Sequence, residues 1–172
     1  MRFLRAELAA LATATAYGLK VGVIADLHTN PYYDPTISAD YDCVKQQGAT
    51  TDVAAPLCRY GCDSSTSLIN VMLQHFRSTF GKPDLLLVTG DHVAHCIDDL
   101  DGKLSTIAIT SQLVNDYFSD TPVLFQIGNN DTKDHDQAPS NADRTSYYTD
   151  LWSMWFKNMD GNQSLYNNSS IQ

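Results

Sequence analysis

Three short apolar runs, each followed at once by metal-binding types of side chain, constrain the fold of this chain more than any other feature. An uninterrupted apolar run is typical of a strand that is buried on both faces in a helix-covered sheet. The runs and the polar residues that follow them are 85–88 with Asp91, 21–25 with Asp26, and 123–127 with Asn129. The sequence therefore predicts an α/β protein whose polar side chains gather where the strands end.

The polar residues at these strand exits are of the kinds that bind divalent cations. Ligands of open α/β sheets bind at the carboxyl ends of the strands. Asp26 and His28 stand two residues apart, so at a strand end both can point to one face and hold one cation. The two oxygens of Asp91 can bridge cations that lie roughly 3.5–4 Å apart, as in two-metal hydrolases. Asn129 adds a neutral oxygen to the second cation, and this mixture of ligands favours Zn, Mn or Fe over Ca.

The three motifs, in this order, resemble those of the calcineurin-like metallophosphoesterases. They read Asp26-Leu27-His28, Gly90-Asp91-x-x-x-His95 and Gly128-Asn129-x-Asp131. Within that family, the cysteine-bearing segment around Tyr60-Gly61-Cys62-Asp63-Ser64 looks like that of the acid sphingomyelinase-like phosphodiesterases and the vacuolar endopolyphosphatases. The resemblance runs from about residue 20 to at least residue 131. It implies a four-layer α/β/β/α sandwich with a dinuclear metal centre, and we expect this sequence to contain only the N-terminal half of that sandwich.

The resemblance also implies a role for each residue of the motifs. Asp26 and His28 would bind the first metal, Asp91 would bridge the two metals, and Asn129 would bind the second. His95 would contact the phosphate or protonate the leaving oxygen. Asn130 stands where many family members carry a histidine, and with His95 it is expected to bind the substrate. The form Gly-Asn-Asn-Asp looks more like that of the endopolyphosphatases.

The ligand set of the second metal is incomplete in this sequence. Family members complete it with histidines on later strands, whereas after His95 this chain has only His135, in a polar loop. We therefore expect residues 19–172 to be the N-terminal part of a metallophosphoesterase domain that hydrolyses phosphodiester or phosphoanhydride bonds with two ions, Zn before Mn or Fe. We also expect residues 1–172 alone to lack enzyme-like turnover. The alternative is a secreted non-catalytic binding protein or pseudoenzyme that retains half of the metal site.

Composition narrows the class of partner. The 172 residues, 43% of them hydrophobic, suit one globular domain with a substantial core. The net charge of −9, with scattered lysines and arginines, argues against nucleic-acid binding through phosphate contacts. No apolar run approaches the length of a membrane span. A small phosphodiester such as a sphingomyelin-like head group, or polyphosphate, is the expected substrate, and the oligomeric state stays open.

The first residues and the cysteines indicate an oxidising compartment. Residues 1–18 combine a basic start, a small apolar stretch and an Ala-x-Ala pattern, as secretory signal peptides do, although a frayed amphipathic helix is the alternative. A secreted or lysosomal or vacuolar location would permit a disulfide between two of Cys43, Cys58 and Cys62, with Cys96 free or paired. Such a bond would tether the long segment 29–62 and stabilise it by roughly 3 kcal/mol. Asn-x-Ser triplets at 162, 167 and 168 are candidate glycosylation acceptors.

Periodicity predicts helices over residues 65–80, 104–118 and 144–159, so that strands and helices alternate in parallel crossovers. Asp63 or Ser64 is expected to cap the first helix. The predicted packing face of that helix consists of Leu68, Val71, Met72, His75, Phe76 and Thr79. His75 is therefore expected in the core or at its boundary, and His92 is expected to face solvent. In the last helix Tyr148, Leu151, Trp152, Trp155 and Phe156 are expected to pack in the core.

Overall fold

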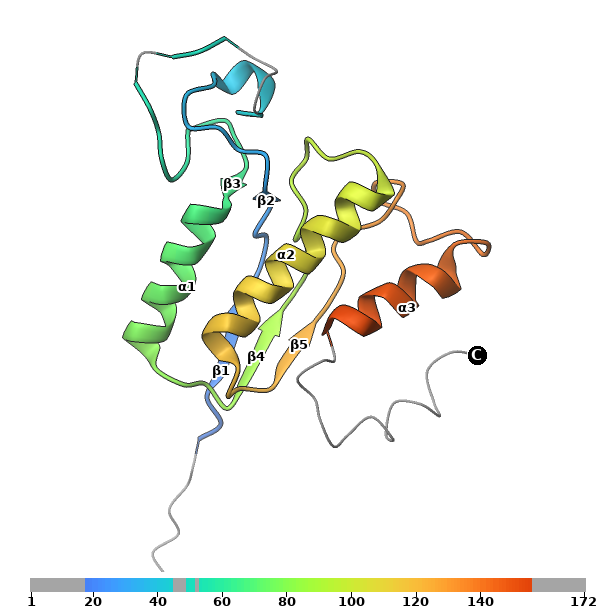
Figure 1. Ribbon diagram of the computed structural model, residues 1–172. Helices are drawn as coiled ribbons and strands as arrows, with labels where there is room; N and C mark the ends of the chain where they lie inside the picture. The colour runs from blue at the N-terminus through green and yellow to red at the C-terminus, as the bar shows by residue number, and fades with distance from the viewer. Residues whose placement is uncertain (1–17, 45–48, 52, 156–172) are drawn as a thin grey trace, which may run out of the picture.

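Three parallel strands form the central sheet of the molecule (Figure 1). The computed structural model describes residues 18–44, 49–51 and 53–155. The strands are β1 (Val21–Ile24), β4 (Leu85–Val88) and β5 (Val123–Phe125), in the spatial order β1-β4-β5. Each pair of neighbours is parallel along its length, which confirms the predicted parallel crossovers. The carboxyl ends of all three strands therefore lie at the same edge of the sheet.

Three helices pack beside this sheet, with α2 in contact with both of the others (Figure 1). They are α1 (Thr66–Phe80), α2 (Leu100–Phe118) and α3 (Arg144–Trp155). The Ser65 hydroxyl caps α1 by accepting a bond from the Leu68 N–H at 3.0 Å, so the cap predicted at Asp63 or Ser64 is wrong. The Asp99 carboxylate caps α2 through the Gly102 N–H, at 2.7 Å. That cap begins α2 four residues earlier than predicted.

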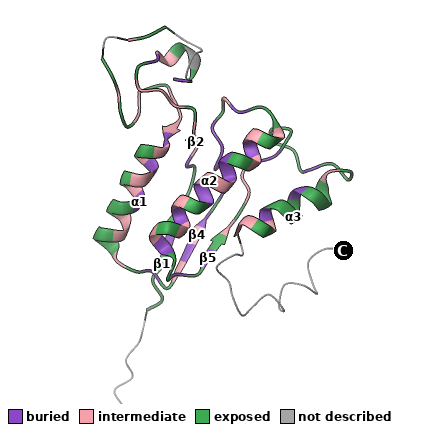
Figure 2. Ribbon diagram, in the orientation of Figure 1, coloured by how far each residue is buried: buried purple, intermediate pink, exposed green. Residues whose placement is uncertain are grey.

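The apolar core lies between the helices and one face of the sheet (Figure 2). Its central members are Ile24, Leu27, Ile69, Leu73, Leu86, Val88, Val114, Phe118 and Val123. A second cluster under the loop that follows β4 consists of Val93, Ala94, Ile97, Ile107, Tyr147 and Leu151. The second cluster joins α2 and α3 to the loop that leaves the middle strand, so packing holds that loop in place.

The other face of the sheet is open in the part of the chain that the structure describes. Val21, Val23 and Leu124 are 42%, 57% and 39% exposed. On β4, Leu85 and Leu87 are only half-buried, whereas their neighbours along the strand are fully buried. The expectation that residues 85–88 are buried on both faces is therefore wrong, because the described helices cover one face only.

The rotation of α1 about its axis differs from the predicted one. Ile69 and Leu73 face the core, whereas Val71 and His75 are exposed, so the prediction of a core or boundary position for His75 is wrong. Packing against α2 sets this rotation, and it leaves the polar imidazole in solvent. In α3, Tyr147 is buried in place of the expected Tyr148. Residues 156–159 of that predicted helix lie outside the described ranges, as do residues 1–17 of the predicted signal peptide and the Asn-x-Ser triplets of the C-terminal segment.

A disulfide joins Cys43 to Cys62, which confirms that a bond links two of the three predicted cysteines. It closes the segment that connects β2 (Thr29–Asn30) to β3 (Ser64–Ser65), two short strands that pair in parallel. The segment also contains the 3-10 helix η1 (Ala39–Tyr41). Cys58 and Cys96 are free thiols. Among the helices of the described ranges, none is both long and apolar enough to cross a membrane.

Candidate metal centre

The loops that follow β1 and β4 run side by side beyond the sheet. The His28 N–H donates to the Asp91 carbonyl at 2.9 Å, and the Thr29 N–H donates to the His92 carbonyl at 2.8 Å. These backbone bonds continue the parallel pairing past the strand ends, so Asp26 and His28 stay beside Asp91. Strand pairing therefore brings residues from two distant motifs to one place, as expected from the sequence.

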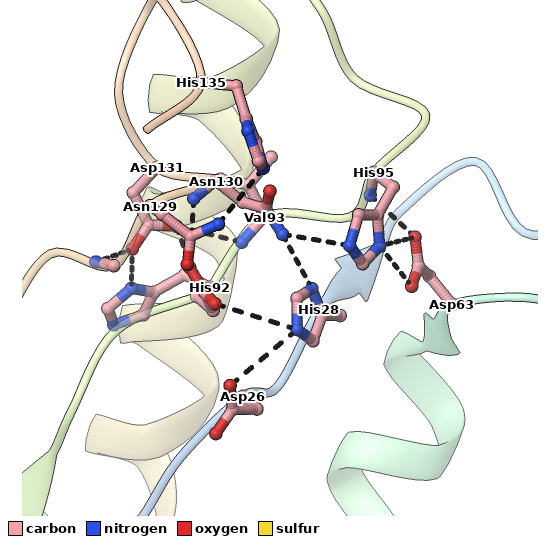
Figure 3. A network of polar contacts seen from close by, with 12 residues as sticks. Asp26, His28, Asp63, His92, Val93, His95, Asn129, Asn130, Asp131 and His135 are labelled. Carbon is pink, nitrogen blue, oxygen red and sulfur yellow. Dashed lines mark hydrogen bonds and ion pairs between the residues drawn. The ribbon is translucent and has the colours of Figure 1, made fainter. Parts of the chain in front are cut away.

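Asp26, His28 and Asp91 form a group that suits one cation. Figure 3 shows the Asp26 carboxylate facing the His28 ring. The Nε2 atom of His28 lies 4.0 Å from Asp26 Oδ1 and 3.9 Å from Asp91 Oδ2. Bonds of 2.0–2.2 Å to zinc place two tetrahedral ligands about 3.4 Å apart, so small side-chain movements would close this set around an ion. Asp26 is exposed, whereas His28 and Asp91 are half-buried, and the group is therefore reachable from solvent. The donor set fits a divalent metal ion.

The backbone at the site adopts conformations that are rare for residues with side chains. Asp26, His28 and Asp91 have φ angles of 54°, 42° and 51°, all in the left-handed region. Such conformations cost free energy and occur mainly at functional sites, where the surroundings enforce them. A Cβ atom on Gly128 would collide with the backbone nitrogen and carboxylate of Asp91, so only glycine permits this close approach.

His95 lies beside the group and is held by Asp63. The backbone N–H of His95 donates to Asp63 Oδ2 at 2.6 Å, and its Nδ1 lies 3.1 Å from Asp63 Oδ1. The ring stacks on that of His28, with centroids 4.6 Å apart and an angle of 11° between the planes. Asp63 directly follows the disulfide-bonded Cys62. The sequence placed it in a family motif and predicted a helix cap for it, but no contact with His95. Its position next to a tethered cysteine was the available signal.

Two asparagines follow β5, and they differ in burial: Asn129 is exposed, whereas Asn130 is buried. The Asn129 amide nitrogen lies 3.1 Å from Nε2 of His135, and the residue is exposed. Asn130 is only 3% exposed, and its amide nitrogen lies 3.1 Å from His28 Nδ1 and 3.3 Å from His95 Nε2 (Figure 3). Its backbone N–H donates to Asp91 Oδ1 at 3.0 Å. The third loop is thereby connected to the other two.

A buried carboxylate, Asp131, ties together the loops that follow β4 and β5. It accepts bonds from the backbone N–H groups of His92, Val93 and Gly128 at 2.8, 3.1 and 2.8 Å. Its Oδ2 also lies 2.9 Å from Nδ1 of His92. The His92 ring is fully buried, so its predicted solvent-facing position is wrong. Burial alone would raise the pKa of Asp131, but the hydrogen bond and charge of His92, with the backbone donors, outweigh burial and lower that pKa.

Comparisons with known proteins agree with this geometry. The sequence pattern described as calcineurin-like phosphoesterase matches residues 19–170. The acid sphingomyelinase-like phosphodiesterase 3b of Mus musculus is 34% identical over 141 residues, which cover 78% of this chain and 30% of that protein. The Homo sapiens protein of the same name is 30% identical over 139 residues, with the same coverage. The endopolyphosphatase of Schizosaccharomyces pombe is 30% identical over 142 residues, which cover 70% of this chain and 25% of that protein.

This chain therefore spans 25–30% of the length of these relatives. The match to the family pattern nevertheless covers most of the chain, and it includes every strand exit described above. The parallel sheet, the convergent motifs and the family match lead to one conclusion: this chain belongs to the calcineurin-like phosphoesterase family, and its mixed α/β structure is part of that fold.

Proposed function

We propose that this chain carries the first-metal side of a phosphoester hydrolase site that acts on phosphodiester or phosphoanhydride bonds. The observation that carries the proposal is the convergence of Asp26, His28 and Asp91 at one sheet edge, with His95 stacked beside them. Bound divalent ions would supply Lewis-acid activation of the attacking water and charge neutralisation at the phosphoryl group. The donor set combines an imidazole with carboxylates, which suits zinc, manganese or iron, and we assign zinc as the first of these to test.

In this proposal His95 exchanges a proton with the leaving oxygen. Asp63 holds the backbone N–H and Nδ1 of His95, so Nε2, which lies 3.3 Å from the Asn130 amide nitrogen, is the nitrogen left for proton transfer. The His95 side chain is 61% exposed and can therefore meet a substrate that arrives from solvent. We assign Asp63 as a positioning residue that acts through His95.

Asp91 and Asn129 would serve the second metal ion. Asp91 Oδ2 faces His28, and Asp91 Oδ1 faces the loop that follows β5, so the carboxylate lies between the two sides of the site. We assign the amide oxygen of Asn129 to the second ion. In the described part of the chain these two residues are the donors that we assign to it, fewer than the first ion has.

The substrate class and the location are also proposals. A small phosphodiester or polyphosphate substrate is supported by the names of the relatives, a phosphodiesterase and an endopolyphosphatase. A secreted protein or one of a lysosomal or vacuolar lumen is supported by the Cys43–Cys62 disulfide, because such bonds persist in oxidising compartments. The share of the relatives that the chain spans supports residues 19–172 as one part of a metallophosphoesterase domain.

A second candidate function is metal-dependent binding of a phosphorylated ligand without turnover. The small number of donors assigned to the second ion favours it, because one ion provides only part of the field that activates water and clamps the phosphoryl group. This candidate retains the Asp26, His28 and Asp91 group as a binding site. The two candidates differ in a single measurable property, which is hydrolysis.

Zinc binding and hydrolysis by the purified chain test both candidates. We would titrate zinc into wild type, His28→Ala, Asp91→Asn and the control Asp134→Asn, an exposed carboxylate outside the group. Hydrolysis of a chromogenic phosphodiester and of polyphosphate would be followed in the same samples. The metal centre is supported if His28→Ala and Asp91→Asn abolish zinc binding and Asp134→Asn leaves it unchanged. Hydrolysis by the wild type then indicates an enzyme, and zinc binding without hydrolysis indicates a binding protein. Zinc binding unaffected by Asp91→Asn would contradict the proposed centre.

A further inference from the structure

The side chain of Asn130 lies at the edges of two imidazole rings of the site. Its amide nitrogen lies 3.1 Å from His28 Nδ1 and 3.3 Å from His95 Nε2, on the edges of two rings that stack on one another. The residue is 3% exposed, so the protein and not solvent determines where the amide points.

Metal binding by His28 requires a particular tautomer of its ring. The nitrogen that faces Asp26 and Asp91 is Nε2, so a cation there needs the lone pair of Nε2, and the ring proton must then reside on Nδ1. A proton on Nδ1 needs an acceptor. Second-sphere acceptors of this kind orient metal-binding histidines in many sites. The carboxamide of Asn130 is the side-chain group that meets His28 Nδ1.

We propose that Asn130 is the positioning residue that orients His28 and Asp91 for binding the cation, an inference that rests on the proposed metal centre. A carboxamide has an acceptor end and a donor end of nearly the same shape, so rotation about its last bond can present either end to His28 Nδ1. The oxygen end selects the Nδ1-protonated tautomer that frees Nε2 for metal. The nitrogen end, which faces the rings in this structure, selects the other tautomer.

The backbone of the same residue orients the second donor. The Asn130 N–H donates to Asp91 Oδ1 at 3.0 Å, and the other oxygen of Asp91 is the one that faces His28. One buried residue thereby holds an imidazole through its side chain and a carboxylate through its backbone. This role differs from the substrate contact that the family resemblance implies for Asn130, because it requires no access to solvent.

The role predicts different effects for two substitutions of Asn130. Leucine is close in size but cannot accept a proton, so Asn130→Leu should weaken zinc binding 10- to 100-fold, the usual effect of losing such a second-sphere partner. Aspartate accepts the Nδ1 proton, so Asn130→Asp should bind zinc at least as tightly as wild type. The matched control is Asn30→Leu, which removes another buried amide near the site; that amide bonds to the Asp42 carbonyl and the Tyr32 N–H and to none of the proposed donors. It should leave zinc affinity unchanged.

The test is zinc titration of the full chain with each variant, together with ¹⁵N NMR of His28. In zinc-saturated wild type and Asn130→Asp, Nδ1 should carry the proton and Nε2 should show the shift of a metal ligand. Wild-type zinc affinity in Asn130→Leu, or a tenfold loss in Asn130→Asp, would overturn the inference. In that case, if His28→Ala still abolished zinc binding, the proposal of a metal centre would stand without the role of Asn130. A wild-type chain that binds no zinc would overturn both. Since Asn130→Asp keeps a polar side chain, it carries the test if Asn130→Leu does not fold.

Discussion

Replacing Asp131 by asparagine should destabilise the fold strongly, although the residue contacts neither a proposed metal ligand nor solvent through its carboxylate. Asp131 Oδ1 accepts the N–H groups of His92 and Val93, and Oδ2 meets the Gly128 N–H and His92 Nδ1. An asparagine can keep its oxygen toward the first pair. Its amide nitrogen then faces the Gly128 N–H, so two donors meet with no acceptor between them.

The expected loss follows from these four contacts. A buried donor left without a partner costs about 1–3 kcal/mol. Two donors lose their partner in this way, because the Gly128 N–H and His92 Nδ1 both face the amide nitrogen that replaces Oδ2. The two bonds that remain lose the charge of the carboxylate, and a neutral hydrogen bond is weaker than a charge-assisted one by about 1 kcal/mol. Together the change should lower the free energy of unfolding by about 4–8 kcal/mol, a large share of the roughly 5–15 kcal/mol that is usual for folded domains.

Urea denaturation followed by tryptophan fluorescence measures this loss. Trp155 stacks on Phe125 at 5.6 Å, near the buried His92 ring, so its emission should report unfolding of the affected region. The control Asp134→Asn removes an exposed charge from the same loop and should change stability by no more than about 0.5 kcal/mol. A loss below 1 kcal/mol in Asp131→Asn would refute the reasoning, because the buried carboxylate would then not be what ties the two loops together.

Three further predictions concern other parts of the molecule. The open sheet face should cause residues 1–172 to self-associate, and Val23→Lys should reduce this self-association. Analytical ultracentrifugation measures it, and a wild type that stays monomeric at high concentration would contradict the prediction. Burial, with the charges of Asp63 and Asp42, raises the pKa of the Cys96 thiol to about 11, so the reactive thiolate is scarce at pH 8. Iodoacetamide labelling read by mass spectrometry should therefore accelerate up to about pH 11, and a half-maximal rate near pH 8.5 would disagree. Cys43→Ser opens the disulfide, whose cysteines are 19 residues apart, and should lower the free energy of unfolding in urea by about 3 kcal/mol. As an internal check, adding a reductant should lower the stability of wild type by the same amount and should not change the stability of the variant.

Much of the fold and of the site could be predicted from local sequence. The apolar runs before Asp26 and Asp91 identify strands, although only one face of each is buried, and parallel pairing then requires their exits to meet at one edge. The family motif Gly90-Asp91-x-x-x-His95 indicated that His95 belongs to the site, and in the structure its ring stacks on that of His28. The cysteine spacing in a long segment predicted a disulfide but could not choose its partners. These features depend on short stretches of chain and on general rules of sheet geometry.

Other features depended on contacts between residues far apart in the chain. His92 is buried because Asp131, 39 residues later, accepts its N–H and meets its ring, and no periodicity around His92 records that partner. Asp63 and His95 are 32 residues apart and were not connected in the sequence reasoning. The rotation of α1, which exposes His75, is set by packing against α2. A local pattern reports which residues of an element are apolar, but the neighbour against which each face packs, and the donor that each buried acceptor meets, exist only once the whole chain has folded.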